Sequence, residues 1–137
     1  MPETRRYSYT VGSSEWSEAS LMPYLPFSLT ASQTTTAVSG LVDSGAAVNV
    51  LPYNVGLQLG LKWDEQKTPI QLSGALSGIE ARGITLTASV NGFEPVRLVF
   101  AWAKSNDMPT ILGQTNFFME FKVHFYRAQQ VFDIEPK

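Results

Sequence analysis

The stretch LVDSGAAVNVLP, residues 41–52, places one acid, Asp43, in a run of small and apolar residues. Burial of a carboxylate is costly unless a partner charge, hydrogen bonds or a shared proton compensates. The apolar flanks predict a turn inside the core, and the nearest basic residue downstream is Lys62. Asp, Ser and Gly are also common turn residues. The stretch is therefore either a plain turn or half of an active site.

The composition limits the classes of protein to which the chain can belong. With 137 residues, 44% of them hydrophobic and 16% charged, it is long enough for one domain with its own core. The net charge of −2 gives no basic surface for nucleic acid. The absence of cysteine excludes disulfides and thiolate chemistry, and the single histidine, His124, excludes a His-rich metal centre. The sequence also has no Gly-rich phosphate loop, HExxH or EF-hand pattern, and we expect neither a metal nor a cofactor.

The amino-terminal residues are polar. Residues 1–20 predict a loose arm ahead of a single domain, residues 21–137, and the run YSYTV within the arm is suited to an edge strand. No stretch approaches about 18 consecutive apolar residues, so the sequence predicts neither a signal peptide nor a membrane span. Together with the lack of cysteine, this predicts a cytoplasmic protein without membrane partners.

Most of the chain reads as short strands separated by turn signals. Apolar and polar residues alternate along the run GITLTASV, as in a half-buried strand, and Asn91-Gly92 after it is a strong hairpin signal. Three hairpins are predicted: 24–31 with 35–42, 83–90 with 95–103, and 121–126 with 129–134. Two short helices are predicted, over 52–61 and 114–121. The fold class is therefore mainly β, as a small closed or nearly closed barrel.

Three elements follow one another in the order found in aspartic proteases. Asp43-Ser44-Gly45-Ala46 resembles their D-[TS]-G-A signature, and Ile111-Leu112-Gly113 resembles their apolar-apolar-Gly triplet before a short helix. Residues 69–83, with Gly74 and Gly78, fit the flap expected between them. The signature occurs once in a short chain, so the sequence resembles the retropepsins, the single-lobe aspartic proteases.

The resemblance implies both a fold and an activity. The fold would be a small closed β-barrel of the acid-protease type with one or two short helices and a β-hairpin flap. The activity would be that of an aspartic endopeptidase, in which two carboxylates share one proton and the ionised one activates water. One signature per chain then requires a homodimer with Asp43 on its twofold axis, acting on peptides or proteins.

The resemblance also assigns residues to the site. The catalytic group would comprise Asp43, Ser44 and Gly45, with Ser44 bracing the two turns across the axis and Gly45 bringing a backbone amide to the carboxylates. Gly113 would lie beneath the turn. The substrate-binding residues would be Ala46, Gly74, Ala75, Leu76, Ser77, Gly78, Met108, Pro109, Ile111 and Leu112.

Two features depart from the family pattern. Gln114 stands where many retroviral members have an arginine that ties the dimer together, so the charge-assisted contacts are lost. A predicted hairpin follows in place of a brief terminal strand, which leaves open whether the chain interleaves its termini with a partner or folds them onto itself.

Other functions stay open at the level of sequence. A retropepsin-like dimer that binds peptides without cutting them would fit the missing arginine, and a β-barrel holding a small apolar ligand would fit the composition. Asp64, Asp107 and Asp133 lie in turn-like or alternating contexts, and we assign them no role. Trp102 is expected in the core.

Overall fold

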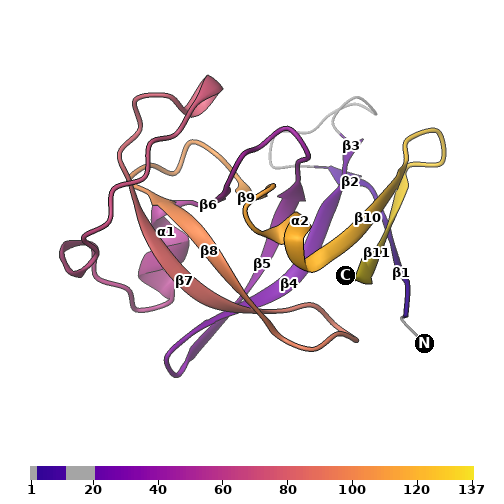
Figure 1. The fold of residues 1–137 in the computed structure, drawn as a ribbon, viewed down its shortest axis with the longest axis horizontal. Helices are drawn as coiled ribbons and strands as arrows, with labels where there is room; N and C mark the ends of the chain where they lie inside the picture. Colours follow the sequence, from indigo (N-terminus) through magenta and orange to yellow (C-terminus); the bar gives the residue numbers. More distant parts are fainter. Residues whose placement is uncertain (1–2, 12–20) are drawn as a thin grey trace.

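The computed structural model describes residues 3–11 and 21–137, and a closed barrel forms the body of the fold (Figure 1). Around the ring, the strands follow in the order β4 (Tyr24–Ala31), β5 (Thr34–Val42), β9 (Thr110–Leu112), β6 (Asn49–Leu51), β8 (Val96–Ala103) and β7 (Ala81–Ser89). The predicted hairpins β4–β5 and β7–β8 are confirmed. Gly92, in the turn between β7 and β8, has φ +92°, which suits glycine.

Strand β9 lies between β5 and β6, although most of the barrel separates it from both in sequence. It runs parallel to β5, with Leu41 opposite Ile111, and antiparallel to β6, with Val50 opposite Ile111. Parallel strands require a long crossover connection, and here β6, β7 and β8 supply it. The Asp-Ser-Gly-Ala turn after β5 and the Ile-Leu-Gly triplet of β9 are thus brought side by side.

The C-terminal hairpin forms a sheet of its own. Strands β10 (Phe121–Tyr126), β11 (Val131–Pro136) and β1 (Arg5–Ser8) pair in the order β1-β11-β10, apart from the barrel. The hairpin turn is longer than predicted, because Gln129 and Gln130 belong to it and Gln130 has φ +57°, which interrupts extended pairing. The chain therefore pairs its own first and last strands.

The predicted polar arm is only partly described, since residues 1–2 and 12–20 lie outside the described residues. The run YSYTV, expected as an edge strand, contributes to two short strands. Its first residues belong to β1, which pairs with β11, and its last two form β2 (Thr10–Val11), which pairs with β3 (Leu21–Met22).

Both helices are shorter than the sequence predicts. Helix α1 (Tyr53–Gln58) ends before Gly60, whose φ of +81° is incompatible with a right-handed helix. Helix α2 (Phe117–Glu120) begins late because the chain before it is not helical: Thr115 pairs with Val48 in a parallel bridge, and Asn116 has φ −136°. A 3₁₀ turn, η2 (Trp63–Glu65), follows α1.

Apolar side chains at every second position of the strands form the core. Ile84, Leu86 and Ala88 of β7 are buried, as their period of two predicts. Trp102 is fully buried, as expected, and its ring lies 5.6 Å from that of Tyr53 and 5.2 Å from that of Trp63, centroid to centroid. Within the described part of the chain, no helix has the length and apolar character needed to cross a membrane.

The predicted flap, residues 69–83, is paired as a hairpin only at its base, beside the start of β7. Two backbone hydrogen bonds of 2.8 and 3.0 Å close this base. Beyond it, the segment forms one 3₁₀ turn, η3 (Gly74–Leu76), at the upper left of Figure 1. Gly74 and Gly78 have φ +65° and +88°, a left-handed conformation that suits glycine and turns the chain at the tip.

Candidate active site

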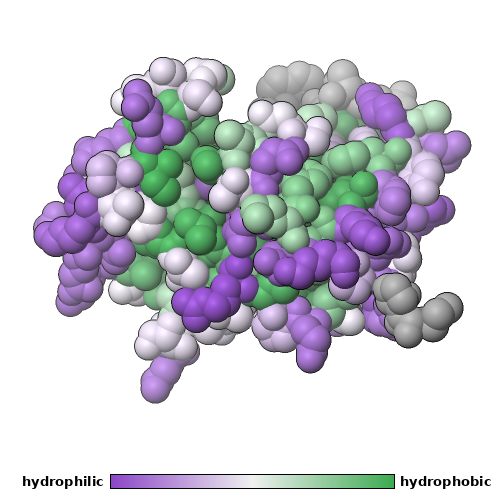
Figure 2. Space-filling view, in the orientation of Figure 1, coloured by the Kyte–Doolittle hydropathy of each residue, from purple (hydrophilic) through white to green (hydrophobic). Residues whose placement is uncertain are grey.

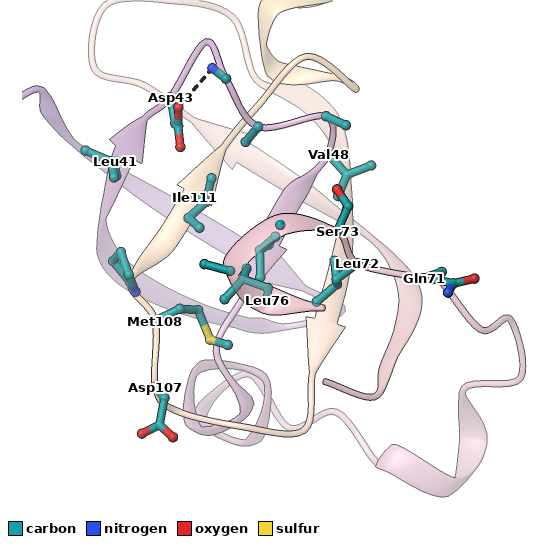
Figure 3. Close-up of a pocket in the computed structure, with 17 residues that line it drawn as sticks. Leu41, Asp43, Val48, Gln71, Leu72, Ser73, Leu76, Asp107, Met108 and Ile111 are labelled. Atoms are coloured by element: carbon teal, nitrogen blue, oxygen red, sulfur yellow. Dashed lines mark hydrogen bonds between the residues drawn. The ribbon is translucent and has the colours of Figure 1, made fainter. Parts of the chain in front are cut away.

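Asp43 lies in a turn directly after β5. Its backbone N–H donates to the Leu112 carbonyl of β9 at 2.9 Å, and its own carbonyl accepts the Ala46 N–H at 3.1 Å. The side-chain Oδ1 accepts the Gly45 N–H at 2.9 Å, the dashed line in Figure 3. The orientation of the carboxylate is therefore held by the backbone of its own turn.

The turn lies at the surface of the barrel, which corrects the prediction that it sits inside the core. Val42 before it and Asn49 after it are buried, whereas Asp43 is half-buried and both Ser44 and Gly45 are exposed. The apolar residues on either side enter the core through β5 and β6, and the turn joins these strands outside it. Asp43 keeps access to water, so its charge needs no buried partner.

Gly113, the last residue of the triplet, lies against the Asp43 turn. A Cβ atom here would lie 2.6 Å from the carbonyl oxygens of both Ala46 and Val48. These neighbours are backbone atoms, which cannot rotate away as a side chain would, so only glycine fits. The next amide, that of Gln114, donates to the same Ala46 carbonyl at 2.8 Å.

Asn49 is a buried polar residue that the sequence reading overlooked. Its Oδ1 accepts the Gly113 N–H at 2.8 Å, while its Nδ2 donates to the Val99 carbonyl at 2.9 Å and to Asn116 Oδ1 at 3.2 Å. A buried amide is stable only when its polar atoms are paired, as they are here. The signal in the sequence was an asparagine inside an otherwise apolar run.

Gln114 also holds the turn through its side chain. Its Nε2 donates to the Ser44 carbonyl at 2.8 Å, within the same chain. Gln114 therefore fixes the turn by a neutral hydrogen bond, at the position where the resemblance places an arginine of the dimer interface.

A cleft of about 450 Å³ opens beside Asp43. The space-filling view shows apolar surface below the η3 segment at the upper left, where this cleft lies (Figure 2). Most predicted site residues line the cleft: Asp43, Gly45, Ala46, Gly74, Ala75, Leu76, Met108, Pro109 and Ile111. Residues from β5, the flap segment and the approach to β9 are thus brought together.

Four predicted site residues do not line the cleft: Ser44, Ser77, Gly78 and Leu112. Ser44 is exposed on the turn, and Ser77 and Gly78 follow η3. Leu112 has an exposed fraction of 0%. Successive side chains of a strand point to opposite faces, so Leu112 and Ile111 face different sides of β9. Ile111 therefore faces the cleft, and Leu112 faces the barrel core.

Several lining residues were not assigned from the sequence: Leu41, Ala47, Val48, Val50, Gln71, Leu72, Ser73 and Asp107. Leu41 and Val50 could have been found from their pairing with Ile111, had the path of β9 been known. Asp107 lies at the opposite end of the cleft from Asp43 (Figure 3). Nothing local in the sequence distinguishes it from other aspartates in turns.

A small apolar cluster, separate from the barrel core, underlies the cleft. Its buried members are Val50, Leu72, Ala81, Ala101, Ala103 and Ile111. Leu72, with an exposed fraction of 5%, anchors the flap segment in this cluster, and Leu76 and Met108 pack against it. The flap segment is therefore held beside the cleft by apolar contacts, although it lacks regular strand pairing.

A barrel that carries an Asp-Ser-Gly-Ala turn against a threaded Ile-Leu-Gly strand defines the retropepsin-like fold. No family model matches the sequence, and no curated protein matches it. Among solved structures, the chain is similar to a retropepsin-like aspartic protease from Rickettsia conorii. The TM-score is 0.68 at 12% sequence identity, and the match covers 99% of this chain and 94% of that one.

The chain is also similar to the EIAV protease complexed with the inhibitor HBY-793. Here the TM-score is 0.52 at 21% identity, over 73% of this chain and 88% of that one. The chain has the fold of the retropepsin-like aspartic proteases, as the sequence motifs indicated.

Proposed function

We propose that the chain is an aspartic endopeptidase that acts as a homodimer. The observation that carries the proposal is the position of Asp43, a half-buried carboxylate oriented by the Gly45 amide beside a largely apolar cleft of about 450 Å³. A concave apolar site with few polar groups suits an organic substrate. The likeness in fold to aspartic proteases supports a peptide as that substrate.

The chemistry requires a second carboxylate within a few ångströms of the first. Among the described residues that line the cleft, Asp107 is the other acid, and it lies at the opposite end. A second copy of the chain would supply the missing partner, with the two Asp43 side chains meeting on a twofold axis. Asp43 and Ser44 are accessible for such a meeting, because the turn lies at the surface.

In the dimer, the two Asp43 carboxylates would share one proton, because like charges at short distance cannot both ionise. The ionised Asp43 takes a proton from water, which attacks the scissile carbonyl, while the protonated one donates to the carbonyl oxygen. The singly protonated pair is the active form. We therefore expect an activity optimum on the acid side of neutrality.

The substrate would lie between the flap segment and the barrel. Leu76 and its neighbours Gly74 and Ala75 would cover it, and Met108 and Ile111 would contact its side chains, which favours apolar residues next to the cut. Ser77 and Gly78, which follow η3 outside the cleft lining, are proposed to contact the substrate once it is bound, whereas the fully buried Leu112 is no longer proposed as a contact. Cytoplasmic location stays a prediction.

The test is cleavage of a diverse peptide mixture from about pH 3 to about pH 8. Wild type is compared with Asp43→Asn and with Asp64→Asn, which makes the same chemical change at an exposed position outside the cleft. We expect cleavage by the wild type and Asp64→Asn, none by Asp43→Asn, and inhibition by a transition-state analogue of aspartic proteases.

Cleavage by Asp43→Asn at the wild-type rate would refute the assignment. A folded dimer that binds peptides but cuts none at any pH would instead favour the non-catalytic peptide-binding module. The neutral side-chain bond of Gln114, in place of a charged clasp, is the observation that keeps this second function under consideration.

A further inference from the structure

We propose that Asp107 selects substrates with a basic side chain several residues from the bond that is cut. The inference rests on the proposed function, because it concerns peptides bound in the same cleft. Among the described residues lining that cleft, Asp43 and Asp107 are the ionisable ones, and the remainder are apolar or neutral. The cleft thus carries negative charge at two separate places and no positive charge from its lining.

The backbone at Asp107 is fixed by its neighbours. The Ser105 carbonyl accepts the Tyr53 N–H at 3.0 Å, and Asn106 Oδ1 accepts the Asn54 N–H at 2.8 Å. The Asp107 N–H donates to Ser105 Oγ at 3.1 Å. These bonds tie the loop before β9 to the first turn of α1, so Asp107 has a defined place at the rim of the cleft.

The carboxylate of Asp107 is available to a ligand. It is exposed and turned outward at the end of the cleft (Figure 3), and it forms no ion pair with any residue that the structure describes. Asp133 shows the contrast, since its Oδ1 accepts a 2.7 Å bond from Arg6. Asp133 thus has its cation within the chain, whereas the exposed Asp107 is in no ion pair among the described residues and can accept a cation from a ligand.

The strand register places Asp107 well away from the reacting atoms. Strands β5 and β9 run parallel, with Gly40 opposite Thr110; Asp43 follows this pair at one end, and Asp107 precedes it at the other. Six residue steps therefore separate the two acids along the strand direction, so an extended substrate cut at Asp43, which rises about 3.3 Å per residue, reaches Asp107 within roughly six residues of the cut. Lysine and arginine have long flexible stems that suit contact with an outward-facing rim carboxylate.

The homodimer doubles this preference. A twofold axis through the Asp43 pair would place the second Asp107 at the other end of the combined cleft. The preferred substrate is therefore apolar next to the cut and basic on both flanks, and a peptide that is basic on one flank gains half of the effect.

The experiment uses matched peptides that differ at one flanking position, which is Lys, Gln or Glu. For cleavage, kcat/KM is measured with wild type, Asp107→Asn, Asp107→Lys and the control Asp64→Asn. For binding, the affinity for the same peptides is measured with two variants that are expected not to cut them: Asp43→Asn, and Asp43→Asn combined with Asp107→Asn. We expect wild type to favour Lys over Glu by about two- to five-fold, the range of an exposed ion pair. The preference should vanish in Asp107→Asn, reverse in Asp107→Lys, and shrink as salt is added.

Equal cleavage of the Lys, Gln and Glu peptides by wild type, or a preference that survives in Asp107→Asn, overturns the inference. The binding arm separates it from the proposed function. If wild type cuts nothing, the protease assignment fails. The role of Asp107 is then decided by binding: Asp43→Asn should bind the Lys peptide more tightly than the Glu peptide, and the variant that also carries Asp107→Asn should not.

Discussion

The side chain of Asn49 accepts the backbone N–H of Gly113 at 2.8 Å, and this bond ties the segment after the Asp43 turn to the end of the Ile-Leu-Gly triplet. Asn49 follows the Asp43 turn, and Gly113 ends the triplet of β9. Asn49 has an exposed fraction of 0%, so loss of the bond would strand polar groups where water cannot replace them. The shape of the turn therefore depends on a residue outside both motifs.

We expect Asn49→Ala to lower the free energy of unfolding by about 2–4 kcal/mol, because it leaves the Gly113 amide and the Val99 carbonyl without their partner and opens a cavity. Urea denaturation measures this change. Asn54→Ala, at an exposed position, serves as the control and should change stability by less than about 0.5 kcal/mol. Equal effects of the two variants would contradict the role given to Asn49.

Mixing variants tests whether one site needs two chains. When Asp43→Asn protein is added in equal amount to a fixed amount of wild type and the chains exchange, activity should fall to about half, and with a ninefold excess to about a tenth. Mixed dimers carry one Asp43 and are inactive, which is the physical reason. Added Asp64→Asn protein should raise activity instead. If added Asp43→Asn protein leaves the activity unchanged, a single chain is sufficient for catalysis.

Gly56 allows α1 to approach Trp102. A Cβ at this position would lie 2.2 Å from two atoms of the Trp102 ring, which is fully buried. We expect Gly56→Ala to destabilise the fold by about 1–3 kcal/mol, although alanine favours helices over glycine by about 1 kcal/mol. Thermal denaturation followed by tryptophan fluorescence measures the change. Leu57→Ala, at a residue with an exposed fraction of 46%, is the neighbouring control. A stabilised Gly56→Ala variant would show that helix propensity outweighs this contact.

The ion pair between Arg6 and Asp133 links β1 to β11 and should make stability depend on pH. The hydrogen bond from Arg6 lowers the pKa of Asp133 below its ordinary 3.8, and the charges of Arg6 and His124 add to this, against the opposing effect of burial. A lowered pKa in the folded state contributes stability above the ordinary pKa and loses it as pH falls through the folded value. The contribution is therefore complete near neutrality and lost in strong acid.

Urea denaturation of wild type and Asp133→Asn at neutral pH, at about pH 4 and at about pH 2.5 tests this dependence. Wild type should be the more stable protein at neutral pH, and the difference should shrink toward the lowest pH. Asp64→Asn should show no such trend. A difference between wild type and Asp133→Asn that stays constant with pH would mean that the ion pair does not set it.

Local patterns in the sequence were sufficient for those elements that depend on neighbouring residues. The β7–β8 hairpin follows from alternation and the Asn91-Gly92 turn, both of which act over a few residues. The placement of β9 depends on strands remote in sequence, so only the family resemblance pointed to it. Helix α2 was overextended for the same reason, since Thr115 pairs with Val48 of a loop distant in sequence and is therefore extended, not helical.

The site was predictable to a similar extent. The motifs identified Asp43 and the flap segment, and most of the residues assigned with them line one cleft. The apolar flanks misplaced the turn in the core, because hydrophobic neighbours in sequence need not be neighbours in space. Asn49 and Asp107 were missed because their places beside the site depend on the fold, which short patterns in the sequence do not reveal.

The position of β9 between β5 and β6 determines when the candidate site can form during synthesis. Ribosomes deliver the Asp43 turn early, but Leu112 and Gln114, whose backbone groups hold that turn, emerge near the end of the described chain. These contacts cannot form before β9 and Gln114 have been synthesised. A nascent or truncated chain would therefore carry the signature without its geometry. The candidate site can therefore take its shape only after β9 and Gln114 have been synthesised.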